Sequence, residues 1–132
     1  MKTLKALVCA LTLGVALTGV ASQAQAADAA AGKAFYETKH AGNKYAAAAG
    51  VSSSGCISCH GNPKSDTKHM KTGKISGPMA VSSGWKDPKT GMARYTDPKK
   101  VEKWFNRNCN GVLGRECTQA EKDNFLAYMA TQ

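Results

Sequence analysis

Two cysteines and a histidine lie close together near the middle of the chain. Cys56 and Cys59 are separated by two residues, and His60 follows directly, which gives a C-x-x-C-H motif. This pattern attaches haem c: the two thiols add to the vinyl groups at one edge of the porphyrin, and the histidine binds the iron as an axial ligand. The motif therefore predicts one covalent haem c held by Cys56, Cys59 and His60.

Two other functions fit this motif less well. A redox-active C-x-x-C pair is typical of a βαβ setting, and no strand pattern surrounds the motif. A structural zinc site needs a second pair of ligands at metal spacing, and His69 alone does not supply one. Haem attachment is the better interpretation.

The sixth ligand of the iron decides between electron transfer and gas binding. Met92 is the best methionine for a permanent His–Met pair. Met79 lies in residues 76–79 (SGPM), which resemble the class I cytochrome c loop beside the proximal histidine, and Met129 falls in a helical pattern, where core packing is expected. Met70 follows His60 by only ten residues, a short tether for reaching the opposite face.

Histidines and an asparagine offer other sixth ligands. His40 and His69 would give a bis-histidine site, although isolated histidines in polar surroundings are usually solvated. In the helix expected from Asp97, Asn108 shares a face with three apolar residues at i, i+3 and i+4, namely Val101, Trp104 and Phe105. This face is expected to turn toward the core and the haem. By the pattern alone, Asn108 is either a ligand or a helix-ending residue bonded to backbone.

Three helices must position these residues. Apolar periodicity predicts a first helix over residues 29–39. Asp97 followed by proline predicts a helix start, with an end near Asn108. A capping box at Thr118 and Glu121 predicts a last helix to Ala130. Residues 41–55 read as a loose connection and residues 61–96 as long loops around the cofactor, so we expect a small all-α domain.

The N-terminus predicts export. Lys2 and Lys5 precede an apolar stretch, and an A-x-A site follows, so residues 1–26 are expected to be a cleaved signal peptide and residues 27–132 one domain. The apolar stretch is too short for a transmembrane anchor, so we expect a periplasmic protein that is peripheral to the membrane at most. Cleavage also removes Cys9, which leaves four cysteines, as is typical of an oxidising compartment.

The composition narrows the function further. The whole chain has 132 residues and a net charge of +9, which becomes +7 once Lys2 and Lys5 are removed. The lysines are not interleaved with aromatic residues, so nucleic acid is not an expected partner. A cluster at Lys64, Lys68, Lys71 and Lys74 would suit an acidic redox partner. No convergent acid–base or nucleophile set supports hydrolysis or group transfer.

The order of helix, C-x-x-C-H motif, loops and two helices resembles class I cytochrome c. Residues 32–36 (GKAFY) are similar to its first helix, and residues 76–79 (SGPM) to its loop beside the proximal histidine. In the last third of the chain, residues 101–104 (VEKW), 107–110 (RNCN) and 114–118 (GRECT) resemble the sphaeroides haem protein (SHP) family. These are exported monohaem cytochromes c with the class I fold.

The SHP resemblance implies a function. It implies that Asn108 is the sixth iron ligand in the oxidised state, that it leaves on reduction, and that O2, NO or CO then binds. It also implies a disulfide between Cys109 and Cys117 and a dihaem cytochrome c as electron donor. Gas binding is the main hypothesis, with turnover of oxygen and nitric oxide left open. The alternative is a plain electron carrier with permanent His–Met coordination through Met92.

Overall fold

The computed structural model describes residues 26–68 and 73–132. The described chain is mainly helical, as predicted, with two antiparallel strand pairs, β1 with β2 and β3 with β4. The elements are α1 (Ala29–Glu37), β1 (His40–Ala41), α2 (Lys44–Ala49), β2 (Ser53–Ser54), α3 (Cys56–His60), β3 (Thr67–Lys68), β4 (Ile75–Ser76), the 3-10 helix η1 (Val81–Ser83), α4 (Pro98–Val112) and α5 (Gln119–Thr131). The predicted signal peptide, apart from Ala26, lies outside the described residues, as do His69, Met70 and Lys71.

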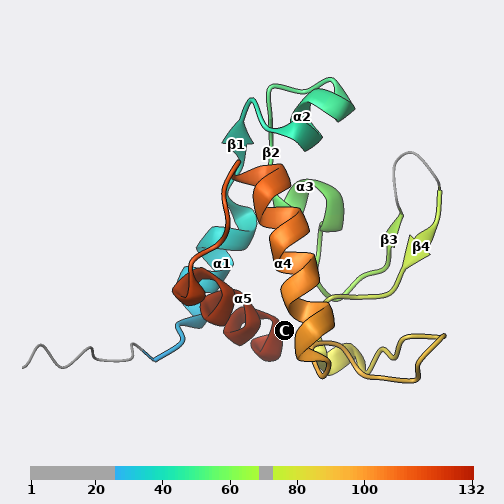
Figure 1. The fold of residues 1–132 in the computed structure, drawn as a ribbon. Coiled ribbons are helices and arrows are strands. Elements are labelled where there is room, and N and C mark those ends of the chain that lie inside the picture. The colour runs from blue at the N-terminus through green and yellow to red at the C-terminus, as the bar shows by residue number, and fades with distance from the viewer. Residues whose placement is uncertain (1–25, 69–72) are drawn as a thin grey trace, which may run out of the picture.

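Helices α1 and α5 pack side by side although they come from opposite ends of the chain (Figure 1). The Asp28 carboxylate caps α1 by accepting hydrogen bonds from the amides of Ala30 and Ala31. Gly32 lets the two backbones approach closely, because a Cβ at this position would lie 1.9 Å from the carbonyl oxygen of Asn124 in α5. The backbones of the first and last helices are therefore in direct contact at this point.

Four buried residues fill the contact between these helices. Tyr36 and Met129 are almost completely buried, and Phe125 and Tyr128 join them in one cluster. The rings of Tyr36 and Tyr128 lie 5.7 Å apart, which is a favourable aromatic separation. Phe105 brings α4 to the same cluster, with its ring centroid 5.4 Å from that of Phe125.

The segment between α1 and α3 is more regular than the predicted loose connection, and this prediction is wrong. Asn43 is buried and accounts for the order. Its side-chain oxygen accepts from the amides of Tyr45 and Ala46, which caps α2, while its Nδ2 donates to the carbonyls of His40 and Ser54. One asparagine thus joins a helix start to both strands of the β1–β2 pair.

The two later helices begin where predicted. The Asp97 carboxylate accepts from the next amides at the start of α4, and Thr118 and Glu121 form the predicted capping box of α5. Helix α4 does not end near Asn108 but continues to Val112, since no proline or other breaker interrupts its backbone ladder. Helix α1 ends at Glu37, two residues before its predicted end.

The stretch from residue 61 to residue 96 consists mainly of loops, as predicted, with the short elements β3, β4 and η1. In Figure 1 the β3–β4 pair extends away from α1 and α5. In the described parts of the chain, no helix combines the length and hydropathy that crossing a bilayer requires.

Candidate functional site

Helix α3 consists of the C-x-x-C-H motif itself. Gly55 precedes it and lets β2 run close to the end of α1, because a Cβ at Gly55 would lie 2.1 Å from the carbonyl oxygen of Thr38. Cys56 and Cys59 are three residues apart on this helix and therefore lie on neighbouring parts of its surface. Neither forms a disulfide. Two free thiols thus project from one helical turn.

The local electrostatics suit axial ligation by His60. Burial raises the pKa of the Cys56 thiol to about 11, so this thiol is protonated at neutral pH. Burial and the positive charge of Arg94 both lower the pKa of His60, so its imidazole is neutral and keeps a free lone pair. In the described residues there is no group of three or more His, Cys, Asp or Glu residues that could hold a metal ion by itself. Two thiols and a neutral imidazole are the donor set that haem c requires.

The backbone that follows His60 is held in place by side chains. Tyr36 donates its hydroxyl hydrogen to the carbonyl oxygen of Gly61, with 2.9 Å between the oxygens. Thr67 donates to the carbonyl oxygen of His60 itself at 3.4 Å. The buried α1–α5 core therefore reaches the histidine through one tyrosine hydroxyl.

A second set of contacts at this turn was not predicted from the sequence. The carbonyl oxygen of Pro63 accepts from the amides of Met79 and Ala80, each at 2.8 Å. The side chains of Arg94 and Tyr95 in turn hold the segment that contains Met79. Arg94 and Tyr95 fall in the predicted loop region, where neither periodicity nor a motif marks them.

Asn108 lies on the last turns of α4, and its side chain is exposed. The side-chain amide makes no hydrogen bond to any described residue, which removes the helix-ending interpretation. The predicted common face is divided: Phe105 packs on Phe125, whereas Trp104 is 44% exposed. Consecutive helical residues point about 100° apart, so Trp104 and Phe105 do not face the same neighbour. Of this face, Phe105 is therefore the residue that packs on the α1–α5 core, while the predicted orientation of Trp104 and Asn108 toward the haem stays a prediction.

The disulfide between Cys109 and Cys117 is present, and both cysteines are buried. It joins the residue directly after Asn108 to the residue directly before Thr118, the N-cap of α5. The predicted pairing is therefore confirmed. The backbone beside Asn108 is consequently tied to the start of the last helix.

The methionines are placed in different surroundings. Met129 is completely buried in the core, as predicted, and Met79 packs against the same cluster. Met92 is 41% exposed in a loop, where its carbonyl oxygen accepts from the amide of Asp87. Met92 as a ligand stays an untested alternative.

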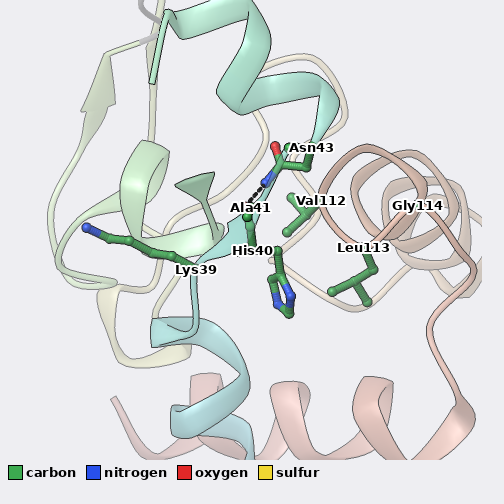
Figure 2. A pocket seen from close by; sticks show the side chains of 8 residues that line it. Lys39, His40, Ala41, Asn43, Val112, Leu113 and Gly114 are labelled. Atoms are coloured by element: carbon green, nitrogen blue, oxygen red, sulfur yellow. Dashed lines mark hydrogen bonds between the residues drawn. The ribbon is translucent and has the colours of Figure 1, made fainter. Parts of the chain in front are cut away.

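His40 lines a cavity of about 420 Å³ between β1 and the end of α4. Figure 2 shows its ring near Val112 and Leu113, and its backbone carbonyl accepting a hydrogen bond from Asn43. None of the predicted haem ligands or attachment cysteines lines this cavity. A bis-histidine site would also need His69, which lies outside the described residues.

This chain is similar to known proteins in both sequence and structure. A family model described as a domain of unknown function (DUF1924) matches residues 22–129. Cytochrome c-type protein SHP of Cereibacter sphaeroides is 35% identical over 134 residues, which cover 93% of this chain and 94% of that protein.

Two solved proteins have a similar structure. Oxidised SHP, described as an oxygen-binding cytochrome c, matches with a TM-score of 0.64 and 37% identity, over 80% of this chain and 83% of that one. Oxidised cytochrome c″ of Methylophilus methylotrophus matches with a TM-score of 0.62 and 34% identity, over 81% and 77% of the two chains. A solution structure of the same cytochrome c″, which addresses haem-ligand detachment, matches with a TM-score of 0.55.

The predicted cytochrome c fold, the covalent haem c and the SHP resemblance are thereby confirmed. With a C-x-x-C-H motif on α3 and the similarity running over nearly the whole chain, this protein belongs to the SHP family of monohaem c-type cytochromes.

Proposed function

We propose that this protein is a periplasmic gas-binding cytochrome c in which Asn108 is a reversible iron ligand. Cys56 and Cys59 attach the haem, and His60 is the permanent axial ligand. The haem supplies an iron that accepts one electron and, in the ferrous state, binds diatomic gases. Asn108 would be the ligand of the ferric iron that leaves on reduction, and the haem would then be open to O2, NO or CO.

The chemistry of an amide supports a ligand that leaves on reduction. A carboxamide oxygen is a hard and weak donor, which suits ferric iron better than ferrous iron. A neutral imidazole binds both oxidation states, so His60 stays bound when Asn108 leaves. Axial-ligand identity is one of the main means by which a protein directs haem toward gas binding or electron transfer.

The single observation that carries the proposal is that the side chain of Asn108 is unrestrained while its backbone is held. Its amide makes no hydrogen bond to a described residue, and the next residue, Cys109, is buried in the disulfide with Cys117. The side chain is therefore free to rotate while its backbone is held. Detachment then requires side-chain rotation and no unwinding of α4. The similarity to oxidised SHP and to a cytochrome c″ studied for haem-ligand detachment supports the same interpretation.

Electrons must reach the iron from a partner, and α4 carries a surface suited to an acidic one. Lys99, Lys103 and Arg107 are exposed at i, i+4 and i+8 and therefore form one stripe along the helix. None of the three is in an ion pair with a described residue, and the Arg107 guanidinium lies 5.3 Å from the ring centroid of the exposed Trp104. A dihaem cytochrome c with an acidic surface would fit this stripe. Screening by salt should slow its reaction.

Optical spectroscopy of the holoprotein tests the ligand. The ferrous wild type is expected to be high-spin and to bind CO readily, and the ferric form should lack the methionine–iron charge-transfer band. Asn108→Ala should make the ferric iron high-spin or water-bound. Asn110→Ala is the matched control, since the Asn110 amide donates to the Asn106 carbonyl and its loss should leave the spectrum unchanged.

Two results would contradict the proposal. A ferric spectrum unaffected by Asn108→Ala would remove Asn108 from the iron. A low-spin ferrous form indifferent to CO would favour the electron carrier, and Met92→Ala would then identify its ligand.

A further inference from the structure

Two consecutive side chains hold three consecutive carbonyl groups. The Arg94 guanidinium donates through Nε to the carbonyl oxygen of Pro78 and through Nη2 to that of Gly77. The Tyr95 hydroxyl donates to the carbonyl oxygen of Met79 at 2.9 Å. We call Arg94 and Tyr95 the clamp. It fixes the backbone that lies against the turn after His60.

The surroundings of the clamp show that its geometry is closely specified. The Arg94 guanidinium lies 4.2 Å from the centroid of the Trp85 ring. Trp85 in turn packs directly on Gly77, where a Cβ would lie 1.9 Å from the indole Nε1. In the described chain, Tyr95 is the one residue other than glycine with a positive φ, at 62°. Such a backbone costs about 1 kcal/mol or more and persists only where its surroundings require it.

The charge of Arg94 is partly withdrawn from water, and the carboxylate of Asp87 acts on it electrostatically. Arg94 is half-buried, and burial lowers its pKa. The nearby acid, Asp87, forms its ion pair with Lys100, and Arg94 is in no ion pair with a described residue. Its guanidinium donates to the backbone of the segment that packs on the turn after His60. Arg94 thus carries a positive charge on the His60 side of the molecule.

The clamp is also connected mechanically to that histidine. Tyr95 holds Met79 through the Met79 carbonyl oxygen. The Met79 amide N–H in turn donates to the carbonyl oxygen of Pro63 at 2.8 Å, and Pro63 lies three residues after His60. Movement of the clamp would therefore displace the turn that carries His60. The charge of Arg94 and the position of the clamp thus both bear on His60.

We propose that Arg94 is a positioning residue of the proximal side, which holds the segment from Gly77 to Met79 against the His60 turn and raises the reduction potential of the iron. Reduction transfers one electron from the external reductant to ferric iron and removes one positive charge there. A fixed cation nearby repels the more positive ferric state and so favours the ferrous state. This inference goes beyond the proposed function, because it concerns the His60 side and holds whichever residue is the sixth ligand.

The expected effect is large enough to measure. In general, a unit charge at about 10 Å and an effective dielectric constant of about 20 changes an equilibrium constant by roughly tenfold, and we take an effect of this size as the expectation for Arg94. Arg94→Gln should therefore lower the equilibrium constant for reduction about tenfold, which is about 59 mV for a one-electron couple. Arg94→Lys retains the charge and should change it less than about threefold, while losing the two-armed hold on the carbonyls.

Spectroelectrochemical titration of the ferric and ferrous holoprotein tests these values. Lys89→Gln is the matched control, since it removes an exposed positive charge from the same loop. The equilibrium constant for reduction should change by less than about twofold in this variant, because solvent screens an exposed charge. Tyr95→Phe removes one bond of the clamp and no charge, so it should lower the thermal midpoint with the potential nearly unchanged.

An unchanged potential in Arg94→Gln would overturn the proposal, and so would an equal decrease in Arg94→Gln and Arg94→Lys. If the glutamine variant does not fold, the lysine variant decides: a tenfold decrease there would overturn it. The same comparison in an Asn108→Ala background separates this inference from the proposed function. There the Arg94→Gln shift should persist, and its disappearance would show that Arg94 acts only through Asn108.

Discussion

The α1–α5 contact and the loop held by the clamp stabilise neighbouring backbone in different ways. Between the helices, Gly32 meets the backbone of Asn124 and aromatic rings fill the remaining space. In the loop, carbonyl groups are satisfied by the side chains of Arg94 and Tyr95, and few large apolar residues take part. The first region depends on shape, and the second on directional hydrogen bonds.

The α1–α5 contact also differs from α4 in what it does for the proposed site. The packed region reaches the turn after His60 through the hydroxyl of Tyr36, so the proposed permanent ligand is attached to the part that tolerates the least movement. Asn108 belongs to α4, which reaches the core through Phe105 but leaves its amide without a partner in the described chain. A rigid proximal side and an unrestrained distal side chain are what a reversible ligand requires.

The largest effect is expected where backbone meets backbone. Gly32→Ala places a methyl group 1.9 Å from the Asn124 carbonyl oxygen, so it should lower the free energy of unfolding by about 3 kcal/mol or more. Gly111→Ala in α4 is the comparison, because its methyl group meets the ring of Tyr45 at 2.2 Å, which is a side chain that can rotate. Its loss should be about 1 kcal/mol or less, partly offset by the helix propensity of alanine.

Urea unfolding of both holoproteins measures this difference. Equal losses in the two variants would show that the α1–α5 contact is no more rigid than the contact between α2 and α4.

The next effect concerns the link between α4 and α5. Replacing both Cys109 and Cys117 by alanine removes a crosslink over eight positions, which is worth about 2.6 kcal/mol in the chain-entropy model. Because the bond constrains backbone beside Asn108, the ferric protein should also lose part of its low-spin signal. Urea unfolding and the ferric spectrum measure the two effects, and Cys109→Ala alone would confuse them by leaving a reactive thiol. Lost stability with an unchanged spectrum would limit the disulfide to a structural role.

The smallest effect at neutral pH is expected in the clamp. Tyr95→Phe removes one hydrogen bond to Met79 and should cost about 1 kcal/mol. Burial raises the pKa of Tyr95 from 10.0 to about 12, and it raises that of Tyr36 as well. Below pH 10 both tyrosines are neutral in the folded and unfolded chains, and pH has no effect through them.

Above pH 10 the unfolded chain releases the Tyr95 proton while the folded chain keeps it, so stability falls as pH rises toward 12. The loss from Tyr95 is about 2.3 kcal/mol at pH 12 and approaches about 2.7 kcal/mol above it. Tyr95→Phe should therefore flatten the alkaline side of the stability profile without abolishing it, because Tyr36 still contributes. An identical alkaline slope in the variant would mean that Tyr95 is already ionised or solvated in the folded state.

Local signals predicted the helices well. Asp28, Asp97 and Thr118 mark helix starts because capping needs only a side chain and the next few amides. The end of α4 is marked locally by Gly114, which follows the C-cap Leu113 with a φ of 69°, and the predicted end near Asn108 did not take this signal into account. The order around Asn43 was missed because its partner Ser54 lies eleven residues away.

The candidate site was predicted unevenly for the same reason. The motif at Cys56, Cys59 and His60 is recognisable because haem attachment depends on covalent spacing along the chain. The pairing of Cys109 with Cys117 came from family resemblance and is present in the structure. Arg94 and Tyr95 were missed because their partners lie about sixteen residues away in a segment without periodicity.

The amino-acid sequence by itself therefore determined the cofactor, its attachment points and the starts of the main helices. All of these depend on contacts within a few residues, where the covalent chain already limits the geometry. Only the tertiary structure decided that α1 packs on α5, that Trp104 and Phe105 face different surroundings, and that Arg94 holds the segment that packs on the turn after His60. Those features arise from contacts between distant segments, and their distances exist only once the chain has folded.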